Sequence, residues 1–119
     1  MTVLVVEDNV YLLQVIADIV EIAGYRVATA GSGEEALRAV EQLDDLKLII
    51  TDYRLPDRDG HELCLTIHRR FPRCKGLIMS GYERGPAVEA IKRNPSLSFL
   101  PKPFGYPELS ERMTSLIGN

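Results

Sequence analysis

Short apolar runs recur along the chain and alternate with longer segments in which the apolar residues have helical spacing. Residues 3–6 form the first run, which is continuous and valine-rich, as in a strand buried on both faces of a sheet. Further strand patterns follow at residues 26–30, 48–51, 76–79 and 97–100. Because five strands alternate with five helical segments through short loops, the pattern predicts an α/β fold with a parallel sheet between two layers of helices.

The helical segments carry their own start and stop signals. The first spans about residues 10–23, and Gly24 is a natural stop for it. Ser32 at an N-cap, with glutamate at N3, forms a capping box, and the helix that follows carries apolar residues as far as Leu43 on one face. The remaining helices are predicted at about residues 60–71, 86–93 and 107–117, the last one opened by a proline.

Length and composition narrow the class of protein. A chain of 119 residues fits one domain, 1–119, and 45% hydrophobic with 26% charged residues is ordinary for a globular protein. The net charge of −3 argues against direct binding of nucleic acid. No apolar run approaches the ~20 residues that span a membrane, and nothing at the N-terminus resembles a signal peptide. We therefore expect a cytoplasmic protein with no membrane segment in this chain.

The cysteines and histidines do not predict a metal site. Cys64 and Cys74 match neither a CxxC motif nor a zinc spacing, so reduced structural thiols are expected. His61 and His68 could share one helix face, but no third ligand has a suitable spacing. Residues 57–60 resemble a fragment of a calcium loop without its other ligands, and we interpret them as a turn and a helix N-cap.

Polar residues follow four of the five predicted strands. Glu7 and Asp8 follow the first strand, Asp52 the third, Ser80 the fourth and Lys102 the fifth. Parallel sheets of this class bind ligands at the edge where these strands end. Neighbouring carboxylates repel one another and need compensating cations. The lysine supplies one cation, and Mg²⁺, which prefers carboxylates, water and phosphate oxygens, fits as the second.

Such a site could accept a phosphoryl group. A carboxylate can attack phosphorus to give an aspartyl phosphate, and the transfer depends on charge neutralisation more than on proton transfer. Asp52 is the best nucleophile because it stands alone at a strand end, whereas Glu7 and Asp8 are adjacent, as a metal-holding pair would be. Taken singly, each acid could be only a helix cap, and either Asp8 or Asn9 could cap the first helix.

Four segments together resemble the receiver domain of response regulators. They are Val-Val-Glu-Asp-Asn (5–9), Ile-Ile-Thr-Asp-Tyr-Arg-Leu-Pro-Asp-Arg-Asp-Gly (49–60), Met-Ser-Gly-Tyr (79–82) and Leu-Pro-Lys-Pro-Phe (100–104). The segments occur in order and the resemblance covers the entire chain. It implies a flavodoxin-like, doubly wound, five-stranded parallel sheet of order 2-1-3-4-5 with five helices. It also implies that Asp52 is the phosphoacceptor.

The resemblance assigns a Mg²⁺ site as well. Asp8 and Asp52 would bind the ion directly, and Glu7 would assist through water. The backbone carbonyl of Arg54 would be the third protein ligand, so the metal would not constrain the side chain at that position.

The resemblance also implies a switch. Ser80 and Lys102 would bind phosphoryl oxygens, and the Lys102-Pro103 bond would be cis, which aims the ammonium group into the site. Phe99 would be the aromatic residue that rotates on phosphorylation, and the face of the fourth helix, fifth strand and fifth helix would change shape for a downstream partner. The donor would be a histidine kinase or a histidine phosphotransfer domain. The protein would be a signalling switch, with only self-catalysed transfer and slow autodephosphorylation.

Other functions fit the sequence less completely. A receiver-like interaction module without phosphorylation would lack some of the site residues, and all of them are present. A Mg²⁺-dependent phosphohydrolase with an aspartyl nucleophile would carry a D-x-D pattern after the first strand, where this chain has Glu-Asp-Asn. Residues 31–36 match a dinucleotide-binding G-x-G-x-x-A pattern, but two glutamates occupy the place of the pyrophosphate. The third and fourth segments are similar to receivers fused to hybrid histidine kinases, and a stand-alone regulator is the alternative.

Overall fold

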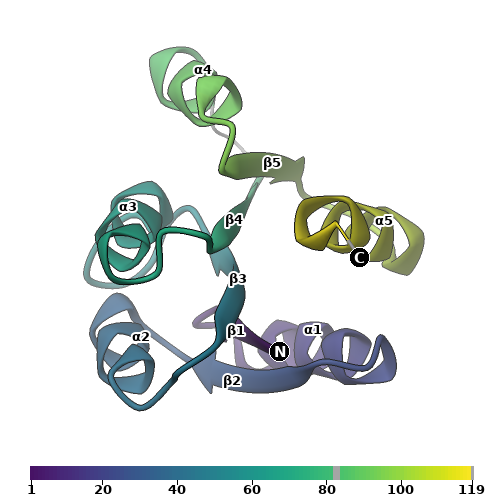
Figure 1. Cartoon of the computed structure of the whole chain (residues 1–119). Helices are drawn as coiled ribbons and strands as arrows, with labels where there is room; N and C mark the ends of the chain where they lie inside the picture. Colours follow the sequence, from purple (N-terminus) through teal and green to yellow (C-terminus); the bar gives the residue numbers. More distant parts are fainter. Residues whose placement is uncertain (82–83, 119) are drawn as a thin grey trace.

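A computed structural model of the chain describes residues 1–81 and 84–118. Its five strands are all parallel and lie in the order β2-β1-β3-β4-β5, as predicted (Figure 1). The strands are β1 (Thr2–Val6), β2 (Arg26–Ala30), β3 (Leu46–Asp52), β4 (Lys75–Ser80) and β5 (Leu97–Pro101). The helices are α1 (Val10–Ile22), α2 (Gly33–Val40), α3 (Gly60–Arg70), α4 (Pro86–Arg93) and α5 (Tyr106–Ile117). None of the described helices is long and apolar enough to cross a membrane.

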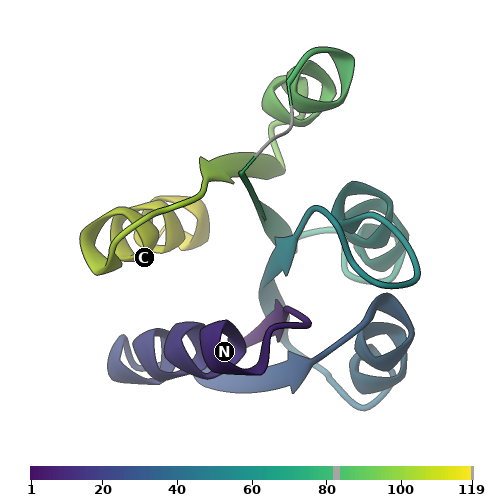
Figure 2. The ribbon, with the colours of Figure 1, turned by 180° about the vertical axis from the view of Figure 1, so that it is seen from behind.

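The sheet separates two layers of helices, each with its own apolar core. Helices α1 and α5 lie on one side of the sheet, and α2, α3 and α4 lie on the other (Figures 1 and 2). Successive strand residues point to opposite faces. Val3 and Val5 accordingly pack in the α1 and α5 layer, whereas Leu4 and Val6 pack in the α2 and α3 layer. The whole of β1 is buried, which explains its continuous apolar sequence.

The first helix takes its N-cap from Asn9, one of the two candidates. The Asn9 side chain accepts hydrogen bonds from the amides of Tyr11 and Leu12 at 3.0 and 3.1 Å. Such a bond satisfies amides that have no partner inside the helix. Because Asn9 does the capping, the carboxylate of Asp8 is available to the neighbouring acidic cluster.

The boundaries of α2 differ from those predicted. The helix ends at Val40, and Leu43 lies beyond it in a turn where its amide bonds to the Val40 carbonyl at 3.1 Å. The Leu43 side chain still packs against the core, so residue 43 is apolar because it is buried, although it is not part of the helix. The capping box is half formed, because Ser32 accepts from the Glu35 amide while the Glu35 carboxylate accepts from the amide of Gly31.

Candidate functional site

Three carboxylates meet at the carboxyl edge of the sheet. Glu7 and Asp8 follow β1, and Asp52 ends β3, which pairs directly with β1 through the Val6 and Thr51 positions. One carboxylate oxygen from each acid lies within 4.8 Å of the others. Two unit charges about 4 Å apart repel by roughly 1 kcal/mol in water, the case for exposed Asp8, and by roughly 4 kcal/mol at an effective dielectric constant near 20, the case for the more buried Glu7 and Asp52. The fold therefore brings these acids together only with cations to offset their charge.

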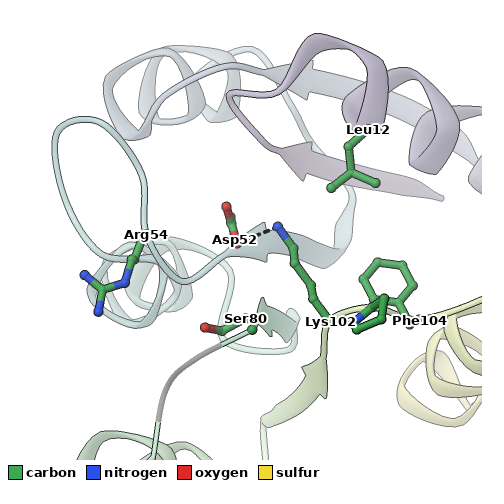
Figure 3. Close-up of a pocket in the computed structure, with 8 residues that line it drawn as sticks. Leu12, Asp52, Arg54, Ser80, Lys102 and Phe104 are labelled. Atoms are coloured by element: carbon green, nitrogen blue, oxygen red, sulfur yellow. Dashed lines mark ion pairs between the residues drawn. The ribbon is translucent and has the colours of Figure 1, made fainter.

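Lys102 supplies one of those cations. Its Nζ lies 3.1 Å from Asp52 Oδ1 and 3.3 Å from Glu7 Oε1, so one ammonium group pairs with two carboxylates. Figure 3 shows the Lys102 and Asp52 side chains pointing toward each other. The Lys102 amide donates to the Ser80 carbonyl at 2.8 Å, which ties the end of β5 to that of β4. The Lys102-Pro103 peptide bond is cis, as expected.

Burial changes the protonation equilibria at this site. The Glu7 side chain is 2% exposed, and burial raises its pKa, with a further increase from the negative charge of Asp52. Its Oε2 accepts a hydrogen bond from the Asn9 amide at 3.0 Å, which opposes this shift. Burial alone would lower the pKa of Lys102, but the hydrogen bond and charge of Asp52, with the charge of Glu7, raise it overall. Three acids facing one ammonium leave an excess of negative charge that a metal ion could offset.

A cavity of about 760 Å³ opens beside the Asp52 and Lys102 pair. Ser80, which is 5% exposed at the end of β4, lines it together with Gly81. Arg54 also lines the cavity, although Figure 3 shows its guanidinium directed away from Asp52. The structure thus brings the expected acids, the hydroxyl, the lysine and Arg54 to one edge of the sheet.

Phe99 lies elsewhere. It is half-buried on β5 and packs against the core on the α2 and α3 side. Arg112 of α5 donates to the Phe99 backbone carbonyl and, at 3.3 Å, to Ser98 Oγ. Phe99 also lines a shallow hollow with Lys92 of α4 and Arg112 of α5, which places it on the face formed by α4, β5 and α5. Tyr82, the last residue of the third sequence segment, lies outside the described residues.

The sequence did not predict two features: an apolar wall of the cavity, and a contact of the loop after β3 with α2. Leu12, in the first turn of α1, and Phe104, after the cis proline, form an apolar wall of the cavity (Figure 3). Residues 57–60 form the expected turn and helix N-cap, since Asp59 accepts from the Glu62 amide at 2.7 Å, but Asp57 also accepts hydrogen bonds from two amides of α2. The position of Leu12 just beyond the acidic pair is a signal that could have placed it, whereas the contact of Asp57 joins segments 24 residues apart.

Known proteins match the chain along nearly its full length. The family model described as the response regulator receiver domain matches residues 3–114. The chain is 29% identical over 117 residues to the sensor kinase CckA of Brucella abortus, covering 98% of this chain and 12% of that protein. It is 32% identical to a response regulator receiver protein of Anaeromyxobacter sp., covering 89% of this chain and 44% of that one. The chain thus spans less than half the length of these relatives.

Solved structures agree with the sequence match. The receiver domain of the hybrid histidine kinase CckA superposes with a TM-score of 0.82 at 30% identity, covering 98% of this chain and 99% of that one. A response regulator receiver domain protein from Clostridium thermocellum superposes with a TM-score of 0.88 at 26% identity, covering 98% and 94%. With the sheet order and the acidic cluster already described, these matches establish that the chain belongs to the response regulator receiver domain family of two-component systems.

Proposed function

We propose that residues 1–119 act as one phosphoacceptor domain of a phosphorelay, in which Asp52 takes a phosphoryl group. The observation that carries this proposal is the position of Asp52 between the Lys102 ammonium, at 3.1 Å, and a pair of further carboxylates beside an open cavity. In this position Asp52 lies beside an ammonium group that can bind the oxygens of an incoming phosphoryl group. It also lies beside two carboxylates with which it can bind a metal ion.

The donor set at the site fits Mg²⁺. The clustered ligand atoms are all carboxylate oxygens, which hard divalent cations prefer. Asp8 and Asp52 would bind the ion directly, Glu7 would hold it through water, and the backbone carbonyl of Arg54 would complete the protein ligands. When bound, Mg²⁺ offsets negative charge on the phosphoryl oxygens.

The transfer itself uses few protein groups. An Asp52 carboxylate oxygen forms the new bond to phosphorus, and the phosphorus–nitrogen bond of a donor phosphohistidine breaks, so that the imidazole nitrogen keeps the electron pair. Lys102 and Ser80 each bind a phosphoryl oxygen. The donor is a histidine kinase or a histidine phosphotransfer domain, and hydrolysis of the aspartyl phosphate by the domain itself is slow.

Phosphorylation then acts as a switch. The new group brings nearly two negative charges and three hydrogen-bond acceptors to the end of β3. Ser80 moves toward it, Phe99 rotates into the space that is vacated, and the face of α4, β5 and α5 changes shape for a downstream protein. A coupling free energy of about 1–3 kcal/mol is typical of such switches. The free, buried thiols of Cys64 and Cys74 suit a cytoplasmic location.

Incubation with acetyl phosphate and Mg²⁺, followed by intact mass measurement, tests the assignment. The wild-type protein is expected to gain about 80 Da, the mass of one phosphoryl group, whereas Asp52→Asn folds but gains nothing. The matched control is Asp44→Asn, which neutralises an exposed acid before β3 and should keep full uptake. Phosphoryl uptake by Asp52→Asn would refute the assignment. Continuous release of phosphate with many turnovers would support a phosphohydrolase instead, and no uptake by wild type would support an interaction module.

The relatives include a sensor kinase and proteins named as response regulators. The chain could therefore serve as a receiver within a hybrid histidine kinase or as a stand-alone regulator. The full reading frame distinguishes these arrangements, because a hybrid kinase places a kinase domain on the same polypeptide.

A further inference from the structure

The segment between β3 and α3 is folded as a small hairpin. Arg54 and Asp59 form an antiparallel bridge, and the Leu55 amide donates to the Arg58 carbonyl at 3.1 Å. These contacts put Asp57 at the tip of the hairpin, at the end remote from the phosphoacceptor strand. A hairpin of this size, with so few bonds of its own, depends on its surroundings for rigidity.

The tip is fastened to the start of α2. Asp57 Oδ1 accepts a hydrogen bond from the Gly33 amide at 2.9 Å, and Oδ2 accepts one from the Glu34 amide, also at 2.9 Å. Both amides belong to the first turn of α2, where no partner inside the helix is available. Bonds from amides to an ionised carboxylate are stronger than neutral ones. The hydrogen bond from the Gly33 amide, more than that from Glu34, accordingly lowers the pKa of Asp57.

Packing supports the same attachment. The Arg58 side chain lies against Gly33 so closely that a Cβ at position 33 would come within 2.6 Å of Arg58 Cδ. At the base of the hairpin, a Cβ on Gly60 would lie 2.2 Å from the Asp52 carbonyl oxygen. Glycine is therefore needed at position 60, and a larger residue at position 33 would displace the Arg58 side chain, so the hairpin is held between α2 and the end of β3.

We propose that Asp57 is a positioning residue for the metal site. It ties the hairpin tip to α2 and thereby fixes the backbone carbonyl of Arg54 at the mouth of the cavity. A main-chain ligand has no rotamers of its own, so only the conformation of the surrounding backbone sets its place. This inference rests on the proposed function, because it takes the Arg54 carbonyl as a Mg²⁺ ligand.

Calorimetric titration of the full chain with Mg²⁺ alone tests the inference. We expect Asp57→Ala to raise the Kd for Mg²⁺ about tenfold, the lower end of the effect seen when groups that orient metal ligands are removed. Asp57→Asn, which keeps one acceptor oxygen, should give an intermediate Kd. Backbone ¹³C NMR supplies a second measurement, since the Arg54 carbonyl signal should shift with Mg²⁺ in wild type and shift less in Asp57→Ala.

Two controls separate positioning from other effects. Ser32→Ala removes the N-cap of α2, an acceptor 3.1 Å from the Glu35 amide, and leaves the hairpin residues unchanged. Glu34→Gln removes one negative charge next to the same helix start. Both control variants should bind Mg²⁺ like wild type.

Each outcome bears on a different claim. Equal Kd values for Asp57→Ala and wild type would overturn the inference and leave the proposed function standing. An equal loss in Ser32→Ala or Glu34→Gln would also overturn it, because helix stability or charge would then account for the effect. A wild-type protein that binds no Mg²⁺, or whose Arg54 carbonyl signal does not shift, would refute the proposed metal site and this inference with it.

Discussion

The acidic cluster should cost the metal-free protein stability, and Asp8→Asn measures that cost. One oxygen of Asp8 lies within 4.8 Å of oxygens of Glu7 and Asp52. Because Asp8 is exposed, a dielectric constant near 80 applies, and each repulsion is roughly 1 kcal/mol. Lys102 pairs with the other two acids at 3.3 and 3.1 Å, so the substitution leaves both ion pairs in place. We expect Asp8→Asn to raise the free energy of unfolding by about 1–2 kcal/mol in EDTA.

Saturating Mg²⁺ should make wild type more stable than Asp8→Asn. An ion that binds only the folded state stabilises it by about 4 kcal/mol at 1,000 times its Kd. Asp8→Asn loses a proposed ligand and gains much less from the same concentration, so wild type becomes the more stable protein. The assay is urea unfolding followed by circular dichroism, in EDTA and in saturating Mg²⁺. The control variant Asp44→Asn should have the same free energy of unfolding as wild type in both conditions.

Two results would contradict this reasoning. If Asp8→Asn were less stable than wild type in EDTA, repulsion within the cluster would not govern its energetics. If both proteins gained equally from Mg²⁺, Asp8 would not be a ligand. The first result concerns the electrostatics of the site, and the second concerns the identity of its metal ligands.

Two further measurements probe the other charged groups at the site. Burial raises the pKa of Glu7 above 4.5, so the folded state binds this proton more tightly than the unfolded state does. The free energy of unfolding of the metal-free protein should therefore fall as the pH rises from 4.5 through the pKa of the folded state. Urea unfolding across this range should show a shallower fall in Glu7→Gln, and identical slopes would argue against the shift. Lys102→Met should slow phosphoryl uptake from acetyl phosphate about 100-fold, as for loss of one preorganised donor to a developing charge. Initial rates of mass gain measure this, and an unchanged rate would remove Lys102 from the transfer.

The helix and sheet layers and the chemistry at the sheet edge can be predicted from the amino-acid sequence alone. Continuous apolar runs separated by amphipathic segments require strands buried between helices, and this pattern is local, so it can be read without coordinates. Asp52 and Ser80 end their strands and Lys102 follows its own, and strands that run parallel bring their ends to one edge. The family resemblance added the strand order, which periodicity does not contain.

Contacts between segments far apart in the sequence depend on how the whole chain folds. The pairing of Lys102 with Glu7 joins residues 95 apart, and the bonds from Asp57 to α2 cross 24 and 23 residues. The cap of α1 is a local contact, two and three residues long, yet the sequence offered both Asp8 and Asn9 for it and the structure selects Asn9. Local sequence offers several partners to a polar side chain, and packing selects one of them because it fixes which groups come within hydrogen-bonding distance.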